Sequence, residues 1–303
     1  MDQTWDDPVV AALSSLVGDG VVRRGLSRGN GRQLRWVETG GNAPTVVLVA
    51  GAGEVALDWA VLLPRLAGRY RVVAYDRAGL GASDRVRPLT VRSQVDDLVA
   101  LLDDVGPAVL VGHSWGGLLA ELAACARPQS VVGLVLVEPF HEDTTTAVPW
   151  RLRAASTAML NGIVALKAVG LFPRIAAGMG RALAERCTAD PRTRALITAA
   201  YLASYSSIGN VATIRAENRL ADVHTDQTRA ARAWSPRPDV PMRILTATRG
   251  KPPALRQRSH DLADATAAGF PRGERRVVAD TGHYIHKDQP AAVAEAIADV
   301  VTP

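Results

Sequence analysis

The chain has 303 residues with a formal net charge of +5, and 48% of its residues are hydrophobic and 21% charged. These values are typical of a soluble globular protein with one large α/β domain and an insertion, or with two small domains. The basic residues, almost all arginine, are spread from Arg23 to Arg276 without a dense block, which argues against nucleic acid as a partner.

The N-terminal part predicts a short helix followed by a hairpin. No basic segment followed by an apolar core opens the chain, so we expect no secretion signal. Asp7-Pro8 is a typical helix start, and the helical pattern continues through Val17. Two strand-like runs, Val21–Leu26 and Gln33–Glu38, flank a glycine-containing turn and predict a β-hairpin.

The next part alternates short apolar runs with helical patterns. Such fully apolar runs predict parallel strands that are covered on both faces. The predicted strands are Thr45–Ala50, Arg71–Tyr75, Ala108–Val111 and Val131–Val137. The predicted helices between them are Asp58–Ala67, Val91–Val105 and Gly116–Arg127.

The region from about 140 to 240 has no convincing strand and predicts a helical insertion. Its alanine-rich helical stretches are Trp150–Gly170, Arg174–Cys187, Arg192–Ser204 and Val211–Val223. The longest apolar stretch of the chain, Ala158–Phe172, is interrupted by Asn161 and Lys167 and is too short to span a bilayer. We therefore expect a cytoplasmic protein with no membrane partner, and the oligomeric state stays open.

Strand-like character returns at Met242–Thr248 and Arg275–Ala279, and a last helix is predicted at Gln289–Val301. The predicted fold is α/β: a mostly parallel central sheet of about eight strands, helices on both faces, and a helical cap inserted after the sixth strand. Residues 1–139 and 241–303 would form the core and residues 140–240 the cap. Cys125 and Cys187 lie in apolar helical patterns, which predicts buried free thiols.

A candidate nucleophile lies in Gly112-His113-Ser114-Trp115-Gly116, directly after an apolar strand and before a helical pattern. A sharp strand–turn–helix presents the serine hydroxyl at its apex, and the small flanking residues let strand and helix approach closely. A serine hydroxyl is a poor nucleophile at neutral pH, so Ser114 needs a base within hydrogen-bond reach and a group that orients that base.

His283 is the predicted base, because it lies in a loop after the last predicted strand, where open α/β sheets place their sites. His113 is next to Ser114 but is expected to point away from it. Packed or solvated roles are expected for the other histidines, which are His141, His224, His260 and His286.

Four segments in order along the chain resemble the α/β-hydrolase superfamily. They are Val47–Gly53 (strand and oxyanion loop), Asp76–Asp84 (a D-x-x-G-x-G-x-S turn), Gly112–Gly116 (the nucleophile elbow), and Thr281–Tyr284 with Gln289-Pro290. The resemblance covers nearly all of the chain and implies a capped member with a serine nucleophile. It also implies an oxyanion hole formed by the N–H groups of Ala52 and Trp115, although Ala50-Gly51 replaces the frequent His-Gly.

The usual position of the acid in this superfamily is empty, because no Asp or Glu occurs from Pro241 through His260. Glu138 follows the strand after the elbow, where some relatives carry their acid, and we predict that it orients His283. Its alternative role is an ion pair with a nearby arginine. The other candidate acids are Asp143, Asp261 and Asp264.

Several other polar residues are assigned structural roles. Asp76 and Asp84 are expected to fix the glycine turn, and Glu54 is expected to be a solvated loop residue. Trp150, Tyr201 and Tyr205 are expected to pack between cap and body. We expect no metal at His141-Glu142-Asp143, because adjacent residues on one loop rarely converge on one ion.

The serine nucleophile predicts acyl chemistry on a small to medium hydrophobic ester, thioester or lactone, through an acyl-enzyme and without a cofactor. One alternative is a biosynthetic enzyme that uses the same pair for elimination, cyclisation or acyl transfer. The other is a ligand-binding protein built on a hydrolase fold.

Overall fold

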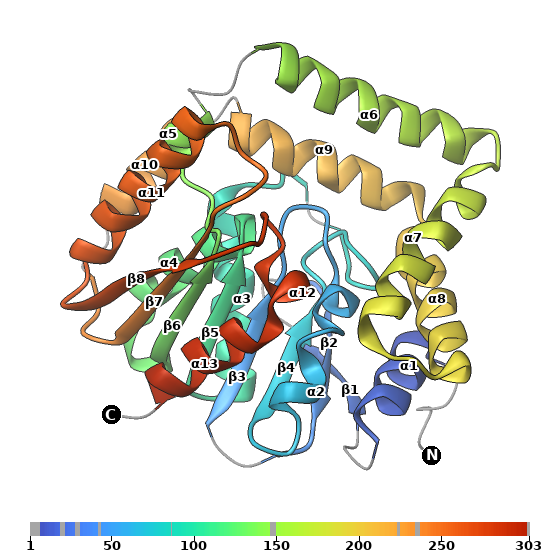
Figure 1. Cartoon of the computed structure of the whole chain (residues 1–303), viewed down its shortest axis with the longest axis horizontal. Coiled ribbons are helices and arrows are strands. Elements are labelled where there is room, and N and C mark those ends of the chain that lie inside the picture. Colours follow the sequence, from blue (N-terminus) through green and yellow to red (C-terminus); the bar gives the residue numbers. More distant parts are fainter. Residues whose placement is uncertain are drawn as a thin grey trace.

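The computed structural model describes residues 7–18, 22–27, 31–41, 44–85, 87–145, 150–222, 225–233 and 237–301 (Figure 1). Its centre is one eight-stranded sheet in the order β1-β2-β4-β3-β5-β6-β7-β8. The strands are β1 (Val22–Ser27), β2 (Leu34–Thr39), β3 (Thr45–Val49), β4 (Arg71–Tyr75), β5 (Ala108–His113), β6 (Val131–Val137), β7 (Pro241–Ala247) and β8 (Arg272–Val278).

The sheet is parallel except at the β1–β2 hairpin edge, where β1 pairs with β2 and β2 with β4 in antiparallel register. β3 pairs with β4 on one side and β5 on the other, and β5, β6, β7 and β8 follow in parallel register. The predicted mostly parallel sheet is therefore confirmed. All parallel strands end at one edge, so the loops that follow β3, β5, β6, β7 and β8 gather there.

Helices cover both faces of the sheet, which explains the unbroken apolar runs of the strands. Alternate β3 residues enter two different cores: Val46 and Leu48 pack on one side of the sheet, Val47 and Val49 on the other. The first face is covered by α1 (Pro8–Val17), the 3-10 turn η1 (Ala56–Trp59), α2 (Leu63–Leu66) and α13 (Pro290–Val301). The second is covered by α3 (Val91–Val105), α4 (Trp115–Ala126) and α11 (Pro253–Ala268).

The predicted helix Asp58–Ala67 is wrong in detail. The structure has the 3-10 turn η1 and the one-turn helix α2 instead, with Pro64 in the first turn of α2. Proline has no N–H to donate to an earlier turn, so its presence favours a new helix start over a continuous helix. A further short turn, η2 (Pro128–Ser130), and the one-turn helix α12 (Ile285–Asp288) complete the elements outside the insertion.

Among its described residues, the chain between β6 and β7 forms helices and no strand, which confirms the predicted helical insertion after the sixth strand. Its elements are α5 (Glu142–Thr145), α6 (Trp150–Ala168), α7 (Phe172–Cys187), α8 (Pro191–Tyr205), α9 (Ile208–Asp222) and α10 (Thr225–Ala233). In Figure 1, α6 and α9 lie above the edge of the sheet where β6 leads into α5, whereas α8 packs beside α1. The sequence pattern did not predict α10. Thr228 is the one buried residue of this helix, so α10 has no apolar stripe.

Candidate active site

Ser114 occupies a strained turn between β5 and α4. Its φ of 50° and ψ of −116° lie in the left-handed region that side chains rarely adopt. Added Cβ atoms at Gly112 and Gly116 would collide with the backbones of residue 116 and of β3 respectively, so this turn requires both glycines. The Ser114 N–H donates to the carbonyl of Val137 at 3.0 Å, which fixes the turn against β6.

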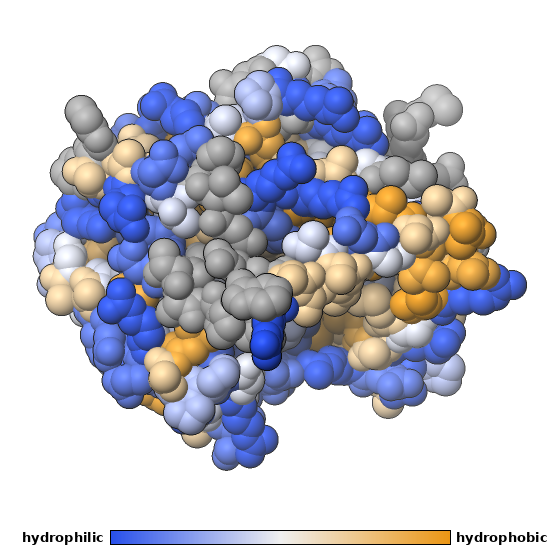
Figure 2. Space-filling model, turned by 90° about the horizontal axis from the view of Figure 1, so that it is seen from above, coloured by the Kyte–Doolittle hydropathy of each residue, from blue (hydrophilic) through white to orange (hydrophobic). Residues whose placement is uncertain are grey.

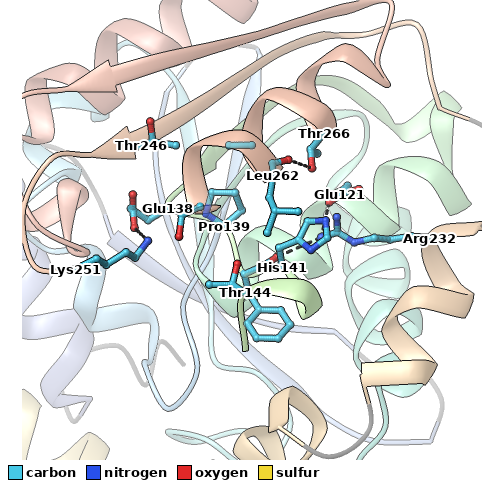
Figure 3. Close-up of a pocket in the computed structure, with 13 residues that line it drawn as sticks. Glu121, Glu138, Pro139, His141, Thr144, Arg232, Thr246, Lys251, Leu262 and Thr266 are labelled. Carbon is cyan, nitrogen blue, oxygen red and sulfur yellow. Dashed lines mark hydrogen bonds and ion pairs between the residues drawn. The ribbon is translucent and has the colours of Figure 1, made fainter. Parts of the chain in front are cut away.

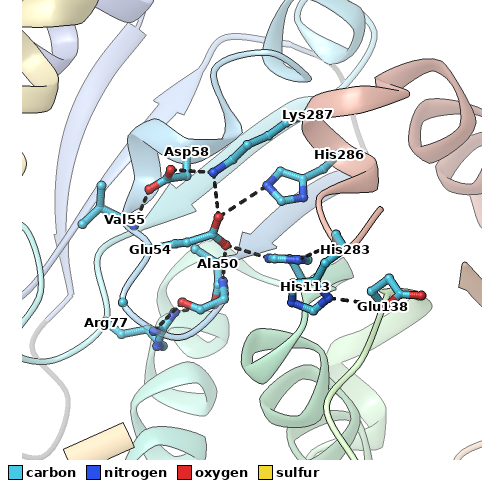
Figure 4. Close-up of polar contacts among 12 residues, drawn as sticks. Ala50, Glu54, Val55, Asp58, Arg77, His113, Glu138, His283, His286 and Lys287 are labelled. Carbon is cyan, nitrogen blue, oxygen red and sulfur yellow. Dashed lines mark hydrogen bonds and ion pairs between the residues drawn. The ribbon is translucent and has the colours of Figure 1, made fainter. Parts of the chain in front are cut away.

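Glu138 and His283, predicted from distant parts of the chain, meet beside this turn (Figure 4). The distance from Glu138 Oε2 to His283 Nδ1 is 3.4 Å, and the other carboxylate oxygen accepts the Ala247 N–H at 2.6 Å. Within the described residues, the Ser114 hydroxyl makes no hydrogen bond to His283. Such contacts are often loose before a substrate is bound.

A lysine shares the carboxylate of Glu138. Lys251 Nζ lies 2.5 Å from Glu138 Oε2, and Lys251 comes from the loop after β7, where the sequence lacks an acid. The ion pair foreseen with an arginine is therefore made with a lysine. Burial alone would raise the pKa of Glu138, but hydrogen bonds from His283, Lys251 and the Ala247 N–H lower it to about 2. The carboxylate is thus ionised at neutral pH.

The alternative acids all have partners elsewhere. Asp143 accepts from Arg229 at 2.7 Å, Asp264 accepts from Arg275 at 2.6 Å, and Asp261 accepts from Gln257 at 2.8 Å. Glu138 is the one candidate acid that the described structure joins to His283 by a hydrogen bond.

The oxyanion loop, residues 50–53, is held on both sides by charged groups. The Arg77 guanidinium donates to the carbonyls of Ala50 and Gly51, the second at 2.8 Å. The N–H groups of Gly51 and Gly53 donate to Glu54 and Glu217 at 2.8 and 2.9 Å. The N–H of Ala52, between these two glycines, has no acceptor among the described residues. The N–H of Trp115, in the first turn of α4, has no intrahelical acceptor either.

The helical insertion contributes directly to this loop through α9. Glu217 and Arg77 form a fully buried pair, with two guanidinium nitrogens within 2.8 to 3.0 Å of the carboxylate. On the same helix, Ile214 packs against Gly53, and the Thr213 hydroxyl donates to the Gly79 carbonyl at 3.1 Å. The sequence did not indicate Glu217, because its partner lies 140 residues away.

Glu54 is not the solvated loop residue that we expected; it is only 8% exposed. It accepts from His113 Nδ1 at 2.7 Å and from Lys287 Nζ at 2.7 Å. The other nitrogen of His113 lies 3.0 Å from the carbonyl oxygen of His283. One ring nitrogen thus faces a carboxylate and the other a backbone carbonyl. His113 therefore links the oxyanion loop to the backbone of the predicted base (Figure 4).

This network extends to the helical insertion. Lys287 also donates to Asp58 at 2.7 Å, and the Tyr205 hydroxyl of α8 donates to the other Asp58 oxygen. Tyr205 thus joins insertion and body as expected, whereas the ring of Tyr201, 4.5 Å from that of Tyr205, lies on the same helix. The side chain of Trp150 and all of His224 lie outside the described residues.

His286 brings a third potential metal ligand beside Glu54 and His113, since the ligand atoms of the three residues lie within 4.8 Å of one another. Its ring packs against His113 and Trp59, and burial lowers its pKa well below the usual value. The ammonium of Lys287, in direct contact with Glu54, already supplies the compensating positive charge. We therefore assign no metal to this cluster.

The glycine turn and the remaining predicted structural groups behave as expected. Asp76 accepts the N–H groups of Ala56 and Ala82 at 2.9 and 3.0 Å, and Asp84 accepts that of Gln33 at 2.9 Å. Both aspartates thus fix the turn. Cys125 is buried and Cys187 half-buried, and both are free thiols.

A small cavity with a mixed polar and apolar lining lies behind Glu138 and Lys251, toward the insertion (Figure 3). Its far wall holds the fully buried Glu121, which pairs with Arg232 at 3.0 Å and Arg237 at 2.6 Å. Burial and the neighbouring Arg232 lower the pKa of His141 to about 4. Arginines also neutralise Glu142 and Asp143, consistent with the absence of a metal role for that cluster.

Residues 46–296 match the family model described as the alpha/beta hydrolase family. The chain belongs to this family.

Individual relatives of this α/β hydrolase differ in chemistry. Epoxide hydrolase A of Mycobacterium tuberculosis is 43% identical over 115 residues, which is 35% of this chain and 36% of that protein. The structure of wild-type Cfl2 from Burkholderia cenocepacia superposes with a TM-score of 0.68 at 24% identity, covering 92% of this chain and 95% of that one. A thioesterase domain from the curacin biosynthetic pathway superposes with a TM-score of 0.62 at 19% identity, covering 91% and 99%.

These relatives show the fold and the family, and they leave the reaction open. This chain spans less than half the length of the curated relatives that it matches, from 6% of a Burkholderia thailandensis polyketide synthase to 49% of a Bacillus subtilis protein. The reaction that this chain can perform therefore depends on Ser114 and the residues around it.

Proposed function

We propose that this α/β hydrolase is a serine hydrolase that cleaves a small to medium hydrophobic ester, thioester or lactone through an acyl-enzyme. The observation that carries the proposal is the juxtaposition of the strained Ser114 turn with His283 and its ionised partner Glu138. A carboxylate nucleophile at the turn would favour other chemistry, whereas a serine favours attack on an acyl carbon.

In the proposed reaction, Ser114 Oγ attacks the carbonyl carbon while His283 Nε2 accepts the hydroxyl proton. Glu138 holds the Nδ1–H of His283 and stabilises the imidazolium. The N–H groups of Ala52 and Trp115 stabilise the negative oxygen that forms. His283 then gives its proton to the leaving alcohol, thiol or ring oxygen. Water, deprotonated by the same imidazole, attacks the acyl-enzyme and releases the acid.

An apolar acyl group is supported by the side chains around the oxyanion loop. Ile214 of α9 lies against Gly53, and the Phe140 ring packs at 5.2 Å from that of Trp115. Ile214 is thus an apolar group beside the loop that carries Ala52, and Phe140 is a half-buried apolar residue in the loop after Glu138. Burying apolar substrate surface there contributes about 25 cal/mol per Å².

A fluorophosphonate probe and short p-nitrophenyl esters test the proposal with the wild type and Ser114→Ala. We expect labelling and turnover in the wild type and neither in the variant. Turnover that persists in Ser114→Ala, or a wild type that is not labelled, overturns the serine mechanism. A wild type that binds the esters but neither reacts with the probe nor turns over is instead a ligand-binding protein.

The second candidate is a biosynthetic enzyme that uses the same site. It is favoured by two similar proteins, a polyketide synthase and a thioesterase domain of a biosynthetic pathway. In that case Ser114 is labelled by the probe, but water does not release the acyl group from simple esters. Adding an amine or alcohol acceptor then distinguishes acyl transfer from hydrolysis, since only transfer yields the new amide or ester.

A further inference from the structure

The outer surface of α6, α7 and the turn between them, residues 150–187, carries an unusual concentration of apolar side chains. We call it the outer corner. Eight large hydrophobic side chains are exposed among the described residues, and five of them lie here, 44 to 67% exposed: Met159, Val169, Leu171, Ile175 and Met179. Figure 2, which looks down on the insertion, shows the apolar (orange) surface gathered at the end where α6 meets α7.

On α7 the apolar side chains form an outward stripe. Leu171, Ile175 and Met179 are four residues apart, so they lie on one face of the helix. The adjoining face of α7, which includes Phe172, Ala176 and Leu183, is buried in the protein core. The apolar surface of α7 therefore extends from its buried face onto its exposed one.

The same segment carries the entire net charge of the protein. Residues 144–184 contain five basic and no acidic residues, so the rest of the chain holds thirty basic and thirty acidic residues. Arg174 and Arg181 are exposed on α7, and neither pairs with a carboxylate among the described residues. Lys167 is turned inward instead, where it donates to the carbonyls of Tyr205 and Ser207 at 2.6 and 2.8 Å.

We propose that the outer corner docks on the surface of an anionic phospholipid bilayer. Leu171 and Ile175 enter the headgroup region, and Arg174 and Arg181 contact the lipid phosphates. Apolar side chains flanked by arginines on a surface helix are what binding in the interface requires. A second copy of this chain fits less well, because pairing two outer corners would bring like charges together.

This docking is parallel to the membrane surface and does not span it. No single described helix is long and apolar enough to cross a bilayer, and α7 is bent by 117° from the second half of α6. The expectation of no membrane partner was based on the length of the apolar stretches. That length decides whether a helix can span a bilayer, and it does not decide whether a helix can bind at the bilayer surface. The inference is independent of the proposed hydrolase activity.

Sedimentation with vesicles tests the proposal with the wild-type chain. Vesicles of phosphatidylcholine alone are compared with vesicles that also contain phosphatidylglycerol, at low and at high salt. We expect binding to the anionic vesicles at low salt, weakened about tenfold or more by high salt or by removal of the anionic lipid. A chain that stays in the supernatant with both vesicle types overturns the proposal.

Two double variants separate the apolar and the charged contribution. Leu171→Asp with Ile175→Asp, and Arg174→Glu with Arg181→Glu, should each weaken vesicle binding about tenfold or more. The matched controls are Val277→Asp, an exposed apolar residue of β8, and Arg65→Glu with Arg272→Glu, two exposed arginines outside the outer corner. The controls should bind like the wild type.

All variants should keep the circular-dichroism spectrum and the thermal unfolding curve of the wild type, which excludes misfolding. Equal vesicle binding by the variants and controls contradicts the proposal. A second contradicting result is a wild type that does not bind vesicles but forms a dimer in size-exclusion chromatography. If Leu171→Asp with Ile175→Asp abolishes that dimer, the outer corner is an interface between copies. The sedimentation assay needs no turnover, so its failure leaves the role of Ser114 intact.

Discussion

The two sides of the candidate active site are built differently. On the oxyanion side, Arg77, Glu217 and Glu54 are buried and hold residues 50–53 through hydrogen bonds, most of them 2.8 to 3.0 Å long. On the acid–base side, the contact between Glu138 and His283 is 3.4 Å long, and the His283 side chain is 40% exposed. One side is fixed by several charges, whereas on the other a single carboxylate is shared by Lys251 and His283.

This difference fits the two tasks that we propose. Dipoles that stabilise a developing negative charge work best when they are held in place before the reaction. A general base must pass a proton from the nucleophile to the leaving group, so its contacts change during the cycle. His113 connects the two sides, because it contacts Glu54 with one nitrogen and the backbone of His283 with the other.

Removing the charge of Glu138, the proposed triad acid, should have the largest effect. Glu138→Gln keeps the shape of the side chain but cannot stabilise an imidazolium, so we expect kcat to fall about 10³- to 10⁴-fold. Steady-state ester hydrolysis measures it, with Asp143→Asn as the control that should stay near the wild-type rate. A rate unchanged in Glu138→Gln would remove Glu138 from the mechanism.

Breaking the buried pair on the oxyanion side should come next. Glu217→Gln leaves Arg77 without a counter-charge, and we expect the free energy of unfolding to fall by about 3 kcal/mol. Because the loop around Ala52 also loosens, kcat should fall about 10²-fold. Urea denaturation and ester kinetics measure the two effects.

The double variant Arg77→Met with Glu217→Leu is the matched test of the Glu217 prediction. It replaces both charges with apolar groups and should recover much of the stability. It cannot restore the hydrogen bonds to residues 50–53, so kcat should stay low. Full recovery of kcat would show that these hydrogen bonds do not organise the oxyanion loop.

The link between the two sides can be cut at His113. His113→Phe removes both ring nitrogens and keeps an aromatic ring, and we expect kcat to fall about tenfold with KM nearly unchanged, since the His283 backbone loses a hydrogen bond. His113→Gln retains one donor and should recover part of the rate. A change in KM alone would mean that His113 only shapes the binding site.

The smallest effect is expected for Lys251, and it concerns pH. Partial burial lowers the pKa of His283, its hydrogen bond with Glu138 raises it in part, and the neighbouring His113 and Lys251 lower it further. The base must be unprotonated to act. The wild type should therefore keep its full kcat/KM at pH values below the usual pKa of histidine. Lys251→Met removes one positive charge, so the acid limb of the profile should move to higher pH.

Arg249→Met is the control for Lys251, because Arg249 lies on the same loop but pairs with the exposed Asp280. Its charge is screened by solvent, and its removal should leave the acid limb in place. An acid limb that stays unchanged in Lys251→Met, or that moves equally in Arg249→Met, would contradict a specific influence of Lys251 on His283.

The sequence predicted well those features that depend on neighbouring residues. Apolar runs such as Ala108–Val111 predicted the parallel strands, and the glycines around Ser114 predicted the turn, because both signals are local. Glu138 was found because the expected acid position after β7 is empty. The partnership of Glu138 and His283 remains a prediction for catalysis that the geometry supports.

The sequence could not predict the charged network behind the site. Glu54 and His113 are 59 residues apart, and Arg77 and Glu217 are 140 apart, so only tertiary packing brings them together. Glu54 was assigned to solvent because nothing local indicates that its carboxylate is buried. The lysine that shares Glu138 was missed for the same reason, although its position in the loop after β7 was visible.

The reach of α9 into the core has a consequence for redesign. Glu217, Thr213 and Ile214 all contact residues outside the insertion, so α9 works as a component of the catalytic core in spite of its place in the chain. A chimera that receives a complete foreign insertion would lose Glu217, the counter-charge of Arg77. Its oxyanion loop would then lose this support, whatever substrate pocket the new insertion formed. An exchange limited to the segment before α9 would change the surface of the insertion and keep the contacts of α9 with the core.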